Sequence, residues 1–298
     1  MNLGIAPPIV NCSSDRSADW ETGASGADLI AIAEVGERLG YSHITASEHI
    51  GLPDHAAAIR GDTYWDALST LSYLAARTQA IRLVTNVLVL GYHHPLAIAK
   101  RYGTLDRLSG GRVTLGVGVG TLVEEFELLG VPFDDRGPRA DDALQALRAS
   151  LGQHLPSYSG PFYQFGGLIV EPHAVQDHVP IWIGGRTRRS VRRATSLADG
   201  WMPFGLAPDE VAAMLADADR PPGFDVVLLP PEPFDPIDQP EQTLRSLDVL
   251  EKAGATLVNV RTVNRSLQHC LEQLHALREL FPIPTGYEQS ATGGSQRG

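Results

Sequence analysis

The sequence predicts a single (β/α)8 TIM barrel over residues 1–285, with a small β-hairpin inserted between its fourth and fifth strands. Short runs rich in β-branched residues alternate with longer amphipathic segments, which is typical of strand–helix units repeated around a parallel sheet. Eight such strands and at least eight helices fit within about 280 residues, which favours a closed barrel over an open doubly wound sheet.

The first strands and helices are read from local signals. Residues 2–7 are expected to form the first strand, and residues 27–40 a helix whose apolar face ends at Gly40, a helix-terminating glycine. The second strand is predicted at 42–49, and the helix after it at 62–78.

The third strand is expected at 81–90, where few polar residues interrupt an apolar run, as in a strand covered on both faces. Pro95 opens a helix that reaches Leu108, because proline is favoured at the first helical position. A glycine-rich fourth strand then covers 112–120.

Two helices and the hairpin lie between the fourth and fifth strands, and the strand–helix alternation then resumes. The helices are expected at 121–129 and 139–151, and the hairpin at 156–172. The remaining strands are expected at 179–185, 199–205, 224–230 and 256–262, and the remaining helices at 190–197, 209–217, 240–252 and 267–280. Residues 286–298 have almost nothing to bury and are expected to be a disordered tail.

Composition excludes several classes of function. The net charge of -11 and the pI near 5.3 argue against nucleic-acid binding, which needs a basic face. Pro7 and Pro8 break the first apolar stretch and no run reaches the length of a membrane span, so neither secretion nor membrane insertion is expected. Cys12 and Cys270 are too few for a disulfide framework, and a cytoplasmic protein is predicted.

Glu48 and His49 end the second strand with a carboxylate and an imidazole, at the mouth where barrels carry their active groups. Imidazole accepts or donates a proton near neutral pH, and the neighbouring carboxylate can orient it. The structural alternative is that Glu48 caps the following segment and His49 is a half-buried imidazole.

Residues 113–120 resemble a dinucleotide fingerprint only superficially, because Thr121 and Val123 stand where the pattern needs glycine. A Rossmann site is therefore rejected. Glycines at this strand end would let a flat ligand or a phosphate approach the backbone, although a tight turn packed for steric reasons is the alternative.

Residues 181–193 are the best phosphate candidate. Paired glycines end a strand, Thr187 and Ser190 stand where a helix begins, and backbone amides at such a helix start favour an anion. Arg186 lies in the loop and is the arginine most expected to contact a ligand, while some of the following arginines are solvated helix surface.

Asn86 interrupts the apolar third strand, which can mark a functional position or a buried amide bonded to backbone. His93 and His94 are adjacent and so cannot share one face as metal ligands. No metal site is predicted, and the motifs of zinc hydrolases, serine hydrolases and P-loop enzymes are absent from the sequence.

These segments, taken in order, resemble the luciferase-like monooxygenase superfamily, in particular its branch that uses the deazaflavin coenzyme F420. The resemblance rests on SEH at the end of the second strand, LVTNVLVL followed by HHP in the third, and KRYGTLDRLSGGRVTLGVGVG through the fourth. VEP, PIWIGG and DGWMP continue the pattern in the same order. The likeness covers nearly the whole chain and is clearest up to about residue 205.

The resemblance implies a cofactor site at the barrel mouth. Glu48 and His49 match the acidic residue and histidine beside the deazaflavin ring, where the histidine acts in proton transfer or stabilises the reduced ring. The bond from Asn86 to Val87 matches a non-proline cis peptide that backs the ring. The cofactor-binding residues expected on this basis are Glu48, His49, Asn86, Val87, Gly118, Gly120, Thr121, Glu124, Gly184, Gly185, Arg186 and Pro203.

The function that the resemblance implies is hydride transfer between coenzyme F420 and an unknown small organic substrate, with His49 as proton partner. Glu48 stands where many deazaflavin members have aspartate. Thr121 replaces an acidic catalytic residue of the family's sugar-phosphate dehydrogenases, which makes a glucose-6-phosphate substrate unsuitable. The alternatives are an FMN-dependent monooxygenase supplied by a separate reductase, a non-catalytic flavin-binding barrel, and a hydrolase or isomerase. A homodimer is expected.

Overall fold

Eight parallel strands close into a barrel, which confirms the predicted fold. The computed structural model describes residues 1–12 and 17–282, so the predicted tail at 286–298 lies outside the described residues. Strands pair in the order β10-β11-β12-β13-β1-β3-β5-β7, and a pairing between β10 and β7 closes the ring. The strands are β1 (Asn2–Ile5), β3 (His43–Ala46), β5 (Arg82–Thr85), β7 (Val113–Gly118), β10 (Ile181–Gly184), β11 (Gly200–Met202), β12 (Asp225–Leu228) and β13 (Leu257–Val260).

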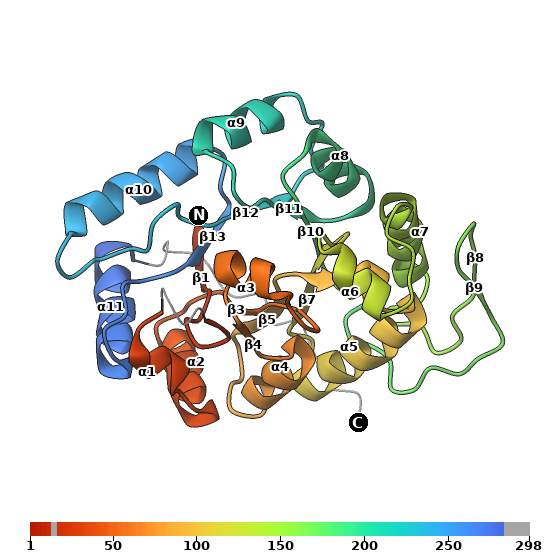
Figure 1. The fold of residues 1–298 in the computed structure, drawn as a ribbon, viewed down its shortest axis with the longest axis horizontal. Helices are drawn as coiled ribbons and strands as arrows, with labels where there is room; N and C mark the ends of the chain where they lie inside the picture. Colours follow the sequence, from red (N-terminus) through yellow and green to blue (C-terminus); the bar gives the residue numbers. More distant parts are fainter. Residues whose placement is uncertain (13–16, 283–298) are drawn as a thin grey trace, which may run out of the picture.

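Helices surround the strands in Figure 1 and cover the outer face of the barrel. The predicted helix that follows each strand is present, with bounds shifted by a few residues in most cases. These helices are α2 (Gly26–Arg38), α4 (Ala67–Ala75), α5 (Pro95–Ser109), α6 (Val123–Leu128), α7 (Arg136–Arg148), α8 (Arg188–Leu197), α9 (Pro208–Ala216), α10 (Pro240–Lys252) and α11 (Leu267–Leu280).

Apolar side chains fill the space between strands and helices, and the barrel interior contains a polar layer. Trp201, Leu83 and Val258 are fully buried in the main core. His43 lies inside the barrel with its ring 5.5 Å from that of Trp182, and its Nε2 bonds to Oδ1 of Asn259. Burial lowers the pKa of His43 to about 4, although the Asn259 bond acts in the opposite direction.

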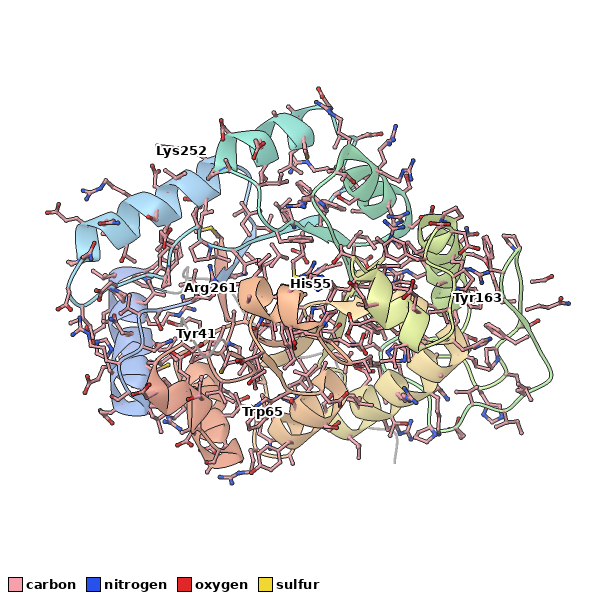
Figure 2. The ribbon with its side chains drawn as sticks, viewed as in Figure 1. Tyr41, His55, Trp65, Tyr163, Lys252 and Arg261 are labelled. Carbon is pink, nitrogen blue, oxygen red and sulfur yellow. The ribbon has the colours of Figure 1, made fainter. Side chains whose placement is uncertain are left out.

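The first and last helices of the ring pack together and hold the two ends of the barrel side by side. Tyr41, labelled in Figure 2, is fully buried and its hydroxyl donates to the carbonyl oxygen of Leu274 at 2.9 Å. Arg278 lies over the Tyr41 ring and donates to the carbonyl oxygens of Leu39 and Gly40. The first and last strands of the barrel, β1 and β13, also pair with each other.

The segment between β3 and α4 differs from the prediction. The helix expected from residue 62 begins at Ala67 instead, because the Asp66 carboxylate accepts a hydrogen bond from the Ser69 amide and so caps the helix there. An unpredicted helix, α3 (Asp54–Arg60), precedes it. Just before α4 lies β4 (Thr63–Tyr64), which pairs antiparallel with β2 (Asn11–Cys12) of the N-terminal segment. In that segment, β2 is followed by α1 (Asp19–Thr22).

The predicted third strand is interrupted at the mouth. β5 ends at Thr85, the Asn86–Val87 peptide bond is cis as the resemblance implied, and β6 (Leu88–Val89) resumes pairing with β7. A short 3-10 helix, η1 (Leu90–Tyr92), replaces the last residues of the expected strand. The second strand also stops early, at Ala46, so that Glu48 and His49 lie just beyond its end.

The insertion between α7 and β10 contains two short strands, β8 (Tyr158–Ser159) and β9 (Gln164–Phe165), which pair antiparallel. Asp142 on α7 fixes the turn, since its carboxylate accepts from the amides of Phe162 and Tyr163. Within the described part of the chain, no helix combines the length and the apolar character needed to cross a membrane.

Candidate functional site

Two adjoining cavities open at the carboxyl ends of the barrel strands. A cavity of about 490 Å³ lies on the side of β3, β7 and β10, and one of about 650 Å³ lies on the side of β1, β12 and β13. Asn11, Ser47, Arg60 and Asn86 line both cavities, so the two spaces meet at the interrupted third strand. We call them the β7-side cavity and the β13-side cavity.

His49 lines the β7-side cavity and is held by a carboxylate behind it. Its Nδ1 lies 2.9 Å from Oε2 of Glu125, and 15% of its side chain is exposed compared with 1% for Glu125. The ring also packs edge-on against Tyr64 at 4.6 Å. An ionised carboxylate only accepts hydrogen bonds, so Nδ1 carries the hydrogen and Nε2 of the neutral ring can accept a proton.

Glu125 is held ionised by its donors. Burial alone would raise its pKa, but hydrogen bonds from His49, Tyr92 and the Ile50 amide outweigh burial, and the pKa lies below its usual value. The Tyr92 hydroxyl donates to Oε2 at 2.6 Å, and burial together with the neighbouring Glu125 charge raises the pKa of this phenol. A permanently charged carboxylate therefore stands behind an imidazole that reaches the cavity.

Glu48 does not orient His49, contrary to the interpretation of the adjacent pair. Its Oε2 accepts from the Val89 amide at 2.7 Å, and its Oε1 lies 2.6 Å from Nε2 of His93. Glu48 lines the β7-side cavity and is almost fully buried. Because it bonds to β6 and to His93, which follows η1, this carboxylate acts on the segment after Val87 rather than on the imidazole next to it.

Val87 lies between two strand-end glycines. A Cβ added to Gly118 would lie 2.8 Å from Val87 Cγ2, and one added to Gly184 would lie 2.7 Å from Val87 Cγ1. Glycines at these positions thus leave room for the Val87 side chain, which agrees with the steric alternative stated for the fourth strand rather than with room for a ligand. All three residues line the β7-side cavity, and Val87 presents an apolar wall to it.

The opposite end of this cavity is cationic. Arg136, Arg186, Arg189 and Arg193 line it near the start of α8. Thr187 caps the helix, with its hydroxyl accepting from the Ser190 amide, and Gly185 precedes it at φ 137°. Arg193 also pairs with Asp141, while Arg186 lies 5.8 Å over the Phe204 ring. Backbone amides and guanidinium groups together make this end suited to an anion.

Most of the predicted site residues meet at the β7-side cavity, but two lie elsewhere. Glu48, His49, Asn86, Val87, Gly118, Gly120, Thr121, Gly184, Gly185 and Arg186 line it. Glu124 is instead paired at the surface with His55 at 3.4 Å. Pro203 lines a small hollow with Leu228 and Leu229, beside the end of β12.

Several residues that shape the mouth were missed by the sequence analysis. Glu125 was missed because Glu124 and Glu125 are adjacent, and the phase of a six-residue helix does not show which of the two turns inward. Arg60 comes from the unpredicted α3 and donates to the Thr121 hydroxyl at 3.0 Å. Arg261, labelled in Figure 2, follows β13 and lines the β13-side cavity with Thr262 and Asn264.

Comparisons with known proteins identify related sequences and related folds. The family model described as luciferase-like monooxygenase matches residues 7–228. An uncharacterised protein of Mycobacterium tuberculosis is 32% identical over 203 residues, which cover 64% of this chain and 70% of that protein. An FMNH2-dependent dimethylsulfone monooxygenase of Pseudomonas putida is 25% identical over 190 residues, covering 62% of this chain and 51% of that protein.

Solved structures share the architecture. The coenzyme F420 dependent tetrahydromethanopterin reductase of Methanopyrus kandleri superposes with a TM-score of 0.72 at 16% identity, and the match covers 92% of this chain and 97% of that one. At this identity the likeness concerns the fold.

Proposed function

The chain belongs to the luciferase-like monooxygenase family, and on this premise we propose that it transfers a hydride between coenzyme F420 and a small organic substrate. One arrangement at the barrel mouth supports this proposal. A single cavity contains an imidazole backed by a buried carboxylate, an apolar wall at Val87 and a cationic end at α8. A ring system with a long anionic side chain needs these three features in this order.

The residues present fit such a cofactor. The apolar Val87 wall suits a flat ring, because Gly118 and Gly184 hold the Val87 side chain in place on its other sides. The start of α8 and Arg186 would hold the phosphate, and Arg189 would extend the cationic surface toward a carboxylate tail. The net charge of -11 makes this cationic surface exceptional for the molecule.

His49 is the proposed proton partner. When bound, F420 supplies the hydride chemistry, and the protein supplies binding, orientation and a proton site. Glu125 accepts the Nδ1 hydrogen of His49, so Nε2 is free to take or return a proton at the ring edge. Glu125 also stabilises the imidazolium that forms, since its own pKa is held low.

The β13-side cavity is the proposed substrate space. It adjoins the cofactor position at Asn86 and Ser47, which line both cavities. Its walls combine apolar residues such as Pro233 and Leu229 with Arg261. Burial lowers the pKa of Arg261, but the guanidinium remains charged. A small organic molecule with one polar or anionic group suits this lining.

The second candidate function is an FMN-dependent monooxygenase that receives reduced flavin from a separate reductase. The similarity to an FMNH2-dependent monooxygenase favours it, and the cationic end of the cavity would equally hold the single phosphate of FMN. A homodimer in the cytoplasm, which the family resemblance implied, forms part of the proposal and is checked by light scattering and by fractionation of the native cell.

Variants of the cationic end test the cofactor orientation. Arg186 and Arg189 line the cavity, whereas Arg192 is exposed on the same helix and does not. We expect the double variant Arg186→Gln, Arg189→Gln to weaken F420 binding by at least roughly a hundredfold, since each of the two lost charge-assisted bonds is worth about 1.5–3 kcal/mol. Arg192→Gln should bind F420 as the wild type does.

The same titration is repeated with the deazaflavin chromophore that lacks phosphate and tail. The double variant should bind this truncated ligand with an unchanged dissociation constant, because the ring is held at the Val87 end. Equal losses for both ligands, or no loss for F420, would contradict the proposed orientation.

A further inference from the structure

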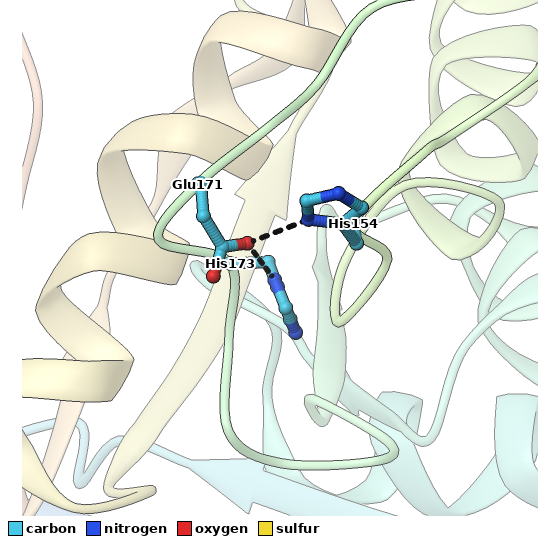
Figure 3. Close-up of side chains that lie close together, drawn as sticks. All are labelled: His154, Glu171 and His173. Atoms are coloured by element: carbon cyan, nitrogen blue, oxygen red, sulfur yellow. Dashed lines mark hydrogen bonds and ion pairs between the residues drawn. The ribbon is translucent and has the colours of Figure 1, made fainter.

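Two histidines and a glutamate converge on the insertion between α7 and β10, on the outside of the barrel. His154 follows α7, while Glu171 and His173 follow the β8–β9 hairpin. Figure 3 shows the three side chains meeting beside a helix, and Lys100 of α5 donates to the backbone oxygen of Glu171. None of the three lines the β7-side or the β13-side cavity. The cluster is therefore separate from the proposed oxidoreductase site.

The geometry brings three ligand atoms to one point. Oε2 of Glu171 lies 3.1 Å from Nδ1 of His154 and 2.7 Å from Nδ1 of His173, and one ligand atom from each residue lies within 4.8 Å of the others. Atoms that bind one tetrahedral Zn²⁺ at ~2.1 Å are separated by roughly 3.4 Å. The two oxygen–nitrogen distances, now 3.1 Å and 2.7 Å, would lengthen by roughly 0.3 Å and 0.7 Å to hold an ion.

The hydrogen bonds also indicate which atoms would bind. A carboxylate oxygen only accepts, so both Nδ1 atoms carry hydrogens aimed at the same oxygen of Glu171. If each neutral ring instead adopts the tautomer that carries its single hydrogen on Nε2, both Nδ1 lone pairs point toward the carboxylate. Two imidazole nitrogens and one carboxylate oxygen form a ligand set preferred by Zn²⁺ and similar transition-metal ions.

We propose that His154, Glu171 and His173 bind a divalent transition-metal ion of the Zn²⁺ class, with the fourth position taken by water. His154 and Glu171 are about half exposed, at 51% and 47%, so the ion reaches the site directly from solvent. The nearby cation does not compete for the ligand atoms, because Lys100 Nζ donates to the backbone oxygen of Glu171 and not to its carboxylate.

The proposed ion would fasten the hairpin to the barrel. Its ligands come from both ends of the insertion, since His154 precedes β8 and the other two follow β9. The backbone is already joined there once, by the Val170 amide donating to the His154 carbonyl oxygen at 2.9 Å. A metal bridge would close this loop a second time and reduce the freedom of the hairpin. The sequence predicted no metal site because residues 17 and 2 positions apart match no common ligand spacing.

The test is a titration of tag-free, metal-stripped protein with Co²⁺ and then Zn²⁺, followed by visible absorption and by metal content after dialysis. We expect one ion per chain, Co²⁺ bands of a four-coordinate nitrogen and oxygen site, and displacement of Co²⁺ by Zn²⁺. Glu171→Gln and His173→Gln should each weaken binding at least about tenfold. His275→Gln, at an exposed position on α11, should leave it unchanged.

Limited proteolysis of the hairpin gives a second readout. Zn²⁺ at a concentration just sufficient to saturate the wild type should slow cleavage between residues 155 and 170 in the wild type and in His275→Gln, and should have a much smaller effect on Glu171→Gln. Circular dichroism of the metal-free Glu171→Gln protein is expected to match the wild type, because the side chain is exposed and nearly isosteric. The proposal is overturned if the wild type binds no ion, or if the cluster variants bind Co²⁺ as tightly as the wild type does.

Discussion

His49 Nδ1 lies 2.9 Å from Oε2 of Glu125, a residue 76 positions away, whereas the adjacent Glu48 is bonded to His93 and the Val89 amide. The imidazole is thus oriented by α6 and not by its own strand. Glu125 gathers further donors from Ile50 and Tyr92, so one buried carboxylate fixes three elements around the mouth. Changes at Glu125 should therefore affect both stability and binding.

Replacing Glu125 with glutamine is expected to lower the free energy of unfolding by about 1–3 kcal/mol. The amide keeps the size of the carboxylate, but its NH2 group would face donors from His49, Tyr92 or Ile50. Urea unfolding followed by tryptophan fluorescence measures this loss. The affinity for the bound cofactor should fall in the same variant, because His49 loses its fixed orientation.

Glu124→Gln is the matched control for this change. Glu124 is the preceding residue on the same helix and pairs only at the surface with His55. Its replacement should change the free energy of unfolding by less than about 0.5 kcal/mol. Equal effects of the two variants would show that Glu125 has no special role at the mouth.

Packing around Val87 gives a second prediction. Gly184→Ala places a methyl group 2.7 Å from Val87 Cγ1 and should destabilise the protein by about 1–3 kcal/mol through overpacking. Combining it with Val87→Ala removes the clash, so the double variant should be more stable than the sum of the two single effects predicts. Thermal and urea unfolding of the four proteins provide the cycle, and strict additivity would contradict the contact.

Acid unfolding tests the buried polar layer. Burial lowers the pKa of His43 from 6.5 to about 4, so the unfolded chain takes up a proton more readily than the folded one in this interval. Stability should therefore fall as the pH drops from 6.5 to 4, with about 3 kcal/mol of the decline due to His43, and this contribution should be constant above pH 6.5.

His43→Gln removes the titrating group and should flatten the decline by that amount, whatever its stability at neutral pH. His275→Gln changes an exposed histidine on α11 and serves as the control. The free energy of unfolding is measured in urea at several pH values for all three proteins. Parallel curves for wild type and His43→Gln would refute the buried-histidine contribution.

Periodic patterns in the sequence predicted the barrel, because strands that are buried between helices consist mostly of apolar residues. The β2–β4 pair escaped prediction because its formation depends on contacts between segments about 50 residues apart, such as Asn11 with Tyr64. His49 was found because strand ends point to the mouth, but Glu125 was not, since its partners come from two other segments, the loop after β3 and η1.

The strand-end glycines also show what the sequence could not predict. The sequence indicated that Gly118 and Gly184 leave space at the strand ends, and only the three-dimensional arrangement shows that the Val87 side chain occupies this space. The His154, Glu171 and His173 cluster likewise depends on how the hairpin folds back, which no local spacing records.

The measurement that tests the central claim most directly is a titration of the cofactor-free protein with F420 and, separately, with FMN, followed by ligand fluorescence. The account predicts tighter binding of F420 by at least about tenfold, with His49→Ala weakening it and His178→Ala leaving it unchanged. Tighter binding of FMN, or no binding of either molecule, would contradict the assignment of this protein to F420-dependent hydride transfer.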